Sequence, residues 1–159
     1  MKPLATLAAV TVAVSATLAA QPTAVAAQDI EKAVAARQST MKLYSFYLGQ
    51  LGAMAKGEVE YDAEAAAKSA QSLNALASLD QSQMWPQGSG VDALGEATRA
   101  LPAIWTTYPA VSEKAQAFAA ASDAMATEAG KDLEALRGAI GAVGKSCGGC
   151  HEDFRQPKD

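Results

Sequence analysis

Several residue types on which other folds and sites depend are scarce in this sequence. β-branched residues are sparse while alanine is abundant, a composition that favours helices and disfavours sheets. Lys and Arg number 13 against 17 Asp and Glu, so the chain lacks the basic face by which proteins recognise nucleic acid. The acidic residues form no pair at a recognisable catalytic spacing, and two cysteines with one histidine fall short of the four ligands of a structural zinc site.

The first 27 residues differ in composition from the rest of the chain. Lys2 supplies a positive charge, and no charged residue follows between Leu4 and Ala20. Small residues then offer a cleavage site after Ala26 or Ala27, so we interpret residues 1–27 as a secretory signal peptide. The alternative is a transmembrane anchor, but this stretch is mostly alanine and threonine rather than strongly apolar. The sequence therefore predicts an exported protein.

Residues 28–159 have the length of a single domain. The helical spacing of apolar residues predicts four helices, over about 29–56, 62–79, 102–129 and 132–155. Pro109 is expected to kink or restart the third of them. The connection 80–100 is long and rich in glycine, and a connection of this length is usually functional or wraps a ligand. Short links join the first two and the last two helices, so we predict an all-α, antiparallel up-down-up-down four-helix bundle.

A group of reactive side chains lies in the run Cys147-Gly148-Gly149-Cys150-His151. On a helix, the two thiols and the imidazole occupy positions i, i+3 and i+4 and so project from one face. The thiols can form thioethers with one haem and the imidazole can bind its iron, which predicts c-type haem attachment on the last helix. The expected export agrees with this, and His151 is the only histidine. The alternatives are a redox dithiol, which would want a strand–helix setting, a zinc site, and a chance occurrence.

Three further residues are candidates for contact with such a haem. Met41 lies on the apolar stripe of the first helix and either packs over the haem or supplies a second iron ligand. Arg37 lies one turn earlier on that stripe and needs an anionic partner, either a haem propionate or a carboxylate of another helix. Arg155 follows His151 by four residues and either lies near the proximal face of the ring or is solvated at the helix C-terminus. The two tryptophans receive no role from the sequence.

Four stretches of this chain resemble the cytochrome c′ family, the class II c-type cytochromes. The resemblance covers nearly all of residues 28–159, and the C-terminal signature matches most closely. The stretches are Arg37–Lys42, Gly52–Glu58 with Tyr61–Ala63, Pro102–Trp105, and Val143–Arg155. The interruption at Pro109 and the middle connection depart from the family's common pattern.

The resemblance implies one haem c, attached through Cys147 and Cys150, with His151 as its proximal ligand. It places Met41 at the family's distal haem-facing position. It also places Arg37 and Arg155 at basic positions near the haem.

For function, the resemblance implies a periplasmic mono-haem cytochrome that transfers single electrons. Most members of the family are five-coordinate homodimers that bind nitric oxide or carbon monoxide. A related subgroup uses a first-helix Met as sixth ligand and carries electrons in a low-spin state, and Met41 is compatible with both groups. A dedicated nitric-oxide-binding protein is a further alternative. We expect no enzyme activity, because a peroxidase would need a distal histidine, and no membrane or nucleic-acid partner. The redox partner is unknown.

Overall fold

The computed structural model describes residues 24–158. Residues 1–23 and Asp159 lie outside the described part, and with them most of the signal segment 1–27 that the sequence predicts. Within the described residues, no helix combines the length and the apolar character that crossing a bilayer requires.

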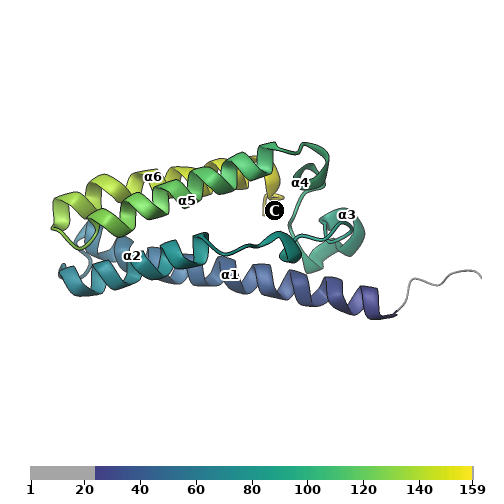
Figure 1. Cartoon of the computed structure of the whole chain (residues 1–159), viewed down its shortest axis with the longest axis horizontal. Coiled ribbons are helices and arrows are strands. Elements are labelled where there is room, and N and C mark those ends of the chain that lie inside the picture. The colour runs from purple at the N-terminus through teal and green to yellow at the C-terminus, as the bar shows by residue number, and fades with distance from the viewer. Residues whose placement is uncertain (1–23, 159) are drawn as a thin grey trace, which may run out of the picture.

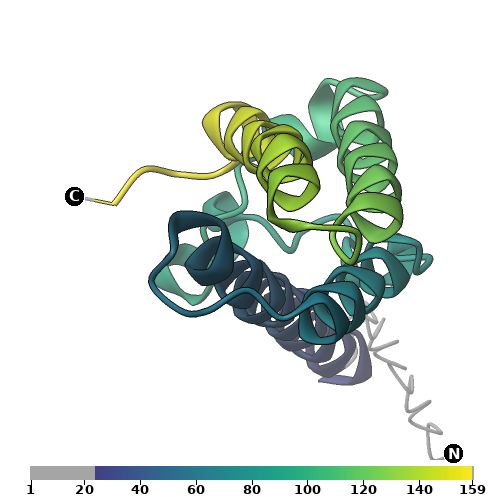
Figure 2. The same ribbon diagram turned by 90° about the vertical axis from the view of Figure 1, so that its left-hand side faces the viewer.

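Four long helices form the body of the molecule, with shorter elements between the second and third of them (Figure 1). In chain order the elements are α1 (Ala24–Lys56), α2 (Ala63–Ala77), η1 (Ser82–Met84), α3 (Val91–Leu94), η2 (Gly95–Ala97), α4 (Ala103–Thr106), α5 (Ala110–Glu128) and α6 (Leu133–Phe154). Helix α1 packs on α2 and α6, α2 packs on α5, and α5 packs on α6. Seen end-on, the four helices are arranged around a common centre (Figure 2). The predicted up-down-up-down bundle is confirmed.

The boundaries of the long helices follow from local signals. The side chains of Asp62 and Asp132 cap α2 and α6 by accepting hydrogen bonds from the backbone N–H groups three residues later, at 2.9 and 2.8 Å. Gly57, with φ of 76°, takes the left-handed conformation that ends α1. At Pro109 the chain does not kink but restarts, because α4 stops at Thr106 and α5 begins at Ala110.

One predicted boundary is wrong. Helix α1 begins at Ala24 rather than near residue 29, where the spacing of apolar residues predicts its start, so Asp29 lies inside the helix. The residues before Asp29 are mostly alanine, which has the highest helix propensity and needs no cap to continue a helix.

The main core lies where the apolar faces of the four long helices meet. Its fully buried side chains come from each of them and include Leu51, Leu73, Met125, Leu136 and Val143. Cys147 packs against this cluster from the C-terminal half of α6. The core thus fixes the face that α6 turns toward the other helices.

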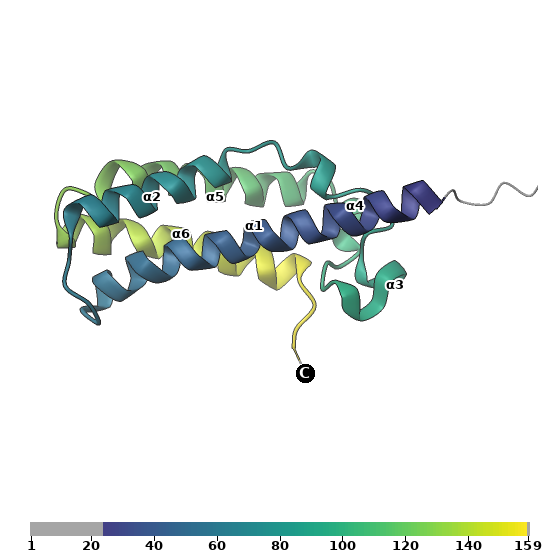
Figure 3. The same ribbon diagram turned by 90° about the horizontal axis from the view of Figure 1, so that it is seen from below.

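A second, smaller cluster lies at the end of the bundle where α6 stops. Ala100, Ile104 and Phe154 are buried there, and Cys150 packs against them. The connection 78–102 crosses this end and holds the chain that leaves α6: Leu101 donates its backbone N–H to the carbonyl of Phe154 at 3.0 Å, and Gln156 donates to Arg99 at 2.8 Å. The view from below shows the C-terminal tail leaving α6 near this region (Figure 3).

Candidate functional site

Cys147, Cys150 and His151 lie on the last turns of α6, which runs unbroken through them to Phe154. The helical spacing places all three on one face, as predicted. Each is half-buried, and the two cysteines are not bonded to each other. Cys147 packs against the main core and Cys150 against the smaller cluster, so the motif lies between the two.

The surroundings set the protonation of these groups. Burial raises the pKa of the Cys147 thiol, and the neighbouring Cys150 raises it further. Burial also raises the pKa of Cys150. The pKa of His151 is lowered, first by burial and then by the positive charges of Arg155 and Arg99. A lowered pKa favours the neutral imidazole, which is the form that binds a metal.

An ion pair joins α5 to the motif. Lys114 Nζ lies 2.9 Å from an Asp153 carboxylate oxygen, two residues after His151. Both side chains remain partly exposed to solvent, so the pair adds little to stability. The pair places the cation of Lys114 beside Cys150. Its positive charge offsets part of the rise that burial causes in the pKa of Cys150.

Arg155 and Arg99 lie at the point where the chain leaves α6. Arg155 is exposed and extended, and its backbone pairs with Ala100 in an isolated antiparallel bridge. Arg99 donates a hydrogen bond to the Gln156 carbonyl. Both charges act on the His151 imidazole. Sequence reasoning identified Arg155 but missed Arg99, which the long connection carries to the site without any periodic signal.

Within the described residues, all hydrogen-bond partners of the buried Arg37 are neutral. Its exposed fraction is 3%, and it has no ion-pair partner there, so the alternative of a carboxylate from another helix is wrong for that part of the chain. Instead Nη1 donates to Ser89 Oγ at 2.6 Å and to the Met84 carbonyl at 3.3 Å, while Nη2 donates to the Ser89 carbonyl and to Thr98 Oγ1 at 2.9 Å. Burial lowers the pKa of Arg37. The propionate contact stays a prediction.

Both tryptophans lie at this end of the bundle, which the sequence did not reveal. The Arg37 guanidinium stacks on the Trp85 ring, 4.7 Å from its centroid. Trp105 donates its indole N–H to the Trp85 carbonyl at 2.9 Å. Both rings pack against the cluster that also receives Cys150. They therefore connect the Arg37 network with the surroundings of the haem motif.

Met41 lies at the edge of the inner stripe of α1. Its side chain is 38% exposed, and Thr40, at 6%, takes the buried position of that turn. One turn later Tyr44 is buried; its hydroxyl donates to the Leu76 carbonyl at 3.1 Å and accepts from Gln81 Nε2 at 2.6 Å. Burial raises the pKa of Tyr44, and the nearby Cys147 raises it further. Tyr44 belongs to the main core cluster and Cys147 packs against it, so α1 and the motif face each other at this level. Within the described residues, Met41 does not belong to either buried cluster.

The donor set suits a haem better than a bare metal ion. Within residues 24–158, no three His, Cys, Asp or Glu side chains gather as a metal-ion site. The two thiols and the imidazole instead follow one another along a helical face, partly accessible and flanked by apolar side chains. That spread is what two thioethers and one axial ligand of a flat macrocycle need.

Residues 32–155 match the protein-family model described as Cytochrome C′. Cytochrome c-554 of Cereibacter sphaeroides is 43% identical over 132 residues, which are 82% of this chain and 84% of that protein. The structure of cytochrome c′ from Rhodobacter sphaeroides aligns with a TM-score of 0.78 at 37% identity, over 81% of this chain and 98% of that one. The nitric oxide complex of a cytochrome c prime mutant from Alcaligenes xylosoxidans aligns with a TM-score of 0.72 at 32% identity, over 81% and 97%.

The family match covers more than half of the chain, and the relative and the two structures agree with it in fold and in extent. The chain therefore belongs to the cytochrome c′ family of non-enzymatic haem proteins, with one haem c bound covalently through Cys147 and Cys150.

Proposed function

We propose that this protein is a periplasmic mono-haem cytochrome that transfers one electron at a time and binds nitric oxide or carbon monoxide at its distal face. The observation that carries the proposal is the placement of Cys147, Cys150 and His151 on one half-buried face of α6. When bound, the haem supplies an iron that alternates between the ferrous and ferric states.

The residues around the motif favour His151 as the axial ligand on the proximal side. Burial lowers the pKa of His151 and so favours the neutral imidazole, the form that binds iron. The backbone pairing of Arg155 with Ala100 fixes the end of α6 directly after this residue. Arg155 itself is the candidate for contact with the proximal face, since its charge already acts on the imidazole.

Gas binding is supported by a relative and by the position of Met41. The Alcaligenes xylosoxidans structure is a nitric oxide complex of a mutant of that cytochrome. In this chain Met41 is flanked on α1 by the buried Arg37 and Tyr44, yet it is itself partly exposed, so it is available to line a distal face. The alternative is a six-coordinate, low-spin electron carrier in which the Met41 sulfur binds the iron. A second alternative is a nitric-oxide-binding protein without a carrier role.

Arg37 is the candidate partner for a haem propionate. A buried cation whose partners are all neutral remains incompletely compensated, because hydrogen bonds to hydroxyl and carbonyl groups do not cancel its charge. A propionate beside the guanidinium would supply the missing negative charge. We therefore expect the network of Ser89 and Thr98 to orient Arg37 toward the cofactor.

Optical and electron paramagnetic resonance spectra of the oxidised holoprotein test these alternatives. A high-spin spectrum, with carbon monoxide binding after reduction, supports an open distal face. A low-spin spectrum with a Met-to-iron charge-transfer band supports Met41 as sixth ligand. A haem that does not cycle between its ferrous and ferric states with a small mediator would refute electron transfer in any form.

Periplasmic location and homodimerisation are parts of the same proposal. Residues 1–27 read as a secretory signal, and c-type haem is attached to exported chains. The outer face of α1 exposes Leu43 and Phe46, at 43% and 58%, and Phe46 stacks edge-on against Tyr47 with ring centroids 5.2 Å apart. An exposed apolar patch of this kind marks a contact surface, which we assign to a second copy of the chain.

A further inference from the structure

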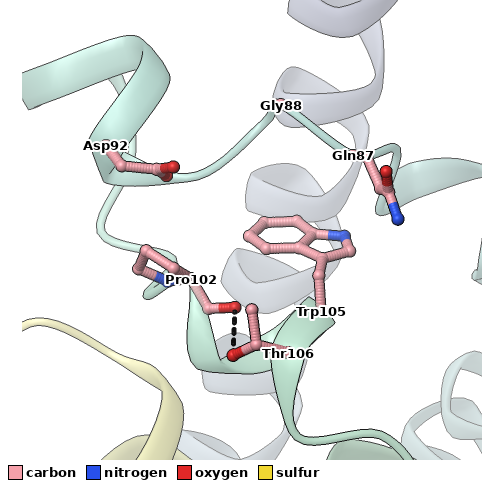
Figure 4. A pocket seen from close by; sticks show the side chains of 6 residues that line it. All are labelled: Gln87, Gly88, Asp92, Pro102, Trp105 and Thr106. Atoms are coloured by element: carbon pink, nitrogen blue, oxygen red, sulfur yellow. Dashed lines mark hydrogen bonds between the residues drawn. The ribbon is translucent and has the colours of Figure 1, made fainter.

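A small open recess lies at the end of the bundle, between the connection and α4. Its volume is about 240 Å³, below the range of about 300–1,000 Å³ that is typical of sites for whole small molecules. It is lined by Gln87, Gly88, Asp92, Pro102, Trp105 and Thr106 (Figure 4). The recess has the size for one inserted side chain rather than for a second cofactor.

The recess combines an aromatic ring with a carboxylate. The Asp92 side chain points over it toward the Trp105 ring (Figure 4). A Cβ atom added to Gly90 would lie 2.5 Å from Asp92 Oδ1 and 2.9 Å from Trp105 Cζ3, so the carboxylate and the ring edge lie close to each other beside Gly90. Gly88 forms part of the rim, with a φ of 78°, and its lack of a side chain leaves the indole ring uncovered on this side.

The carboxylate is available to an outside cation. Asp92 is exposed, and within residues 24–158 it has neither an ion-pair partner nor a side-chain hydrogen bond. Thr106, another polar residue of the lining, already donates its hydroxyl to the Pro102 carbonyl at 3.3 Å. A planar cation could stack on the indole and pair with the carboxylate at once.

The recess is also next to the haem motif. The Trp105 ring that lines it packs against the cluster of Ala100, Ile104 and Phe154, and Cys150 packs against the same cluster. A partner anchored in the recess is thereby held at the end of the bundle where the haem is attached.

We infer that this recess is the docking point for an arginine or lysine side chain of a basic redox protein that exchanges electrons with the haem. The inference rests on the electron-transfer function proposed above. Charge complementarity identifies the partner, because the chain carries a net charge of −4 and one of its acidic side chains, Asp92, lines the recess. Arginine fits better than lysine, since its guanidinium both stacks on an indole and pairs with a carboxylate through two N–H groups. One electron passes from the iron of one protein to that of the other, and no covalent bond forms or breaks.

The test uses the reduced holoprotein mixed in stopped flow with oxidised mitochondrial cytochrome c, a basic one-electron acceptor, at low ionic strength. Asp92→Asn should lower the second-order rate constant by about threefold or more, since loss of a contacting charge slows docking. Glu96→Gln is the matched control: it removes the same charge from the adjacent, exposed position in η2 that does not line the recess. It should leave the rate within about 1.5-fold.

A second pair of variants tests docking at the recess without removing an acidic residue. Gln87→Arg places a competing guanidinium on the rim and should slow exchange, whereas Gln83→Arg adds the same charge to η1, outside the recess. In the unmodified protein, the peptide acetyl-Gly-Arg-Gly-amide at millimolar concentration should slow exchange more than its citrulline analogue. The Asp92→Asn variant should lose that difference.

Equal effects of Asp92→Asn and Glu96→Gln, or of the two added arginines, would overturn the inference. Exchange with a small uncharged mediator separates this failure from failure of the proposed function. If the mediator oxidises the haem but the variants match their controls, only the docking point is refuted. If the haem does not cycle with the mediator, electron transfer itself is refuted.

Discussion

The Arg37 guanidinium lies over the Trp85 ring, 4.7 Å from its centroid, and so joins α1 to the connection that crosses the end of the bundle. The same group donates to Ser89 and Thr98 further along that connection. One buried side chain of α1 therefore organises a segment that has little regular structure of its own. Because the segment also pairs with the end of α6 and the chain after it, it links α1 to α6.

Thr98→Val tests how much this network stabilises the fold. The substitution keeps the shape of the side chain but removes an acceptor that lies 2.9 Å from Arg37 Nη2 and 3.2 Å from the Ala100 backbone nitrogen. A hydrogen bond to a charged group contributes about 1.5–3 kcal/mol, so the free energy of unfolding should fall by about that amount. Chemical denaturation of the holoprotein measures it. Thr127→Val is the control, since that exposed hydroxyl donates to the Asp123 carbonyl of its own helix, and it should cost far less. Equal costs would contradict the assigned role of Arg37.

Haem attachment predicts that substitutions of the two cysteines change the haem spectrum, whereas substitution of the neighbouring Ser146 does not. Cys147→Ser and Cys150→Ser should each abolish the alkaline pyridine spectrum of a haem with two saturated vinyl groups, because one thioether is lost. Denaturing mass spectrometry then reports whether the remaining bond retains the haem. Ser146→Ala, whose hydroxyl bonds only the Val143 carbonyl, should leave both readouts unchanged. Retention of the two-thioether spectrum in either cysteine variant would show that the attachment is wrongly assigned.

Met41→Ala distinguishes the two proposed states of the iron. If Met41 only lines the distal face, the ferric spectrum stays high-spin and carbon monoxide association becomes faster, since a partly exposed side chain no longer obstructs the ligand. If its sulfur binds iron, the charge-transfer band disappears and the spectrum turns high-spin. Met54→Ala is a control that leaves the spectrum intact, because Met54 is buried in the main core.

The regular parts of this fold follow from the sequence for identifiable reasons. The caps at Asp62 and Asp132, the restart at Pro109 and the shared face of Cys147 and His151 all depend on local chemistry that residue type reveals. Thr40 illustrates the limit of such reasoning. Positions three and four residues after Arg37 are equivalent in a helical repeat, and only packing places Thr40 inside with Met41 at the edge.

The surroundings of Arg37 could not be predicted from the sequence for a different reason. Two of its acceptors are the backbone carbonyls of Met84 and Ser89, and a carbonyl is present at every residue. Only the path of the connection determines which carbonyls are available. The connection lacks periodicity, so its path and the positions of Trp85 and Trp105 could not be derived from spacing.

Phe46→Glu tests the assignment of the outer face of α1 to a dimer. A carboxylate at this 58% exposed position costs the monomer little but cannot be buried against a second copy without a partner. Sedimentation equilibrium should therefore show a shift toward monomer, by about tenfold or more in the dissociation constant. Val59→Glu, at a 53% exposed position beyond the end of α1, is the control and should leave the assembly unchanged. A monomeric unmodified protein would refute the dimer directly.

Asp132→Ala tests whether the stability of α6 can change without a change in the spectrum and ligand binding of the haem. Asp132 accepts a hydrogen bond from the Ala135 backbone N–H at 2.8 Å, so its loss leaves a helix N-terminal N–H without that acceptor. The free energy of unfolding should fall by about 1 kcal/mol. The haem motif lies at the opposite end of the helix, so the optical spectrum and carbon monoxide binding should be unaffected. A changed spectrum would mean that the start of α6 controls the iron. In that case the haem geometry would depend on the whole helix, rather than on the turn that holds Cys147, Cys150 and His151.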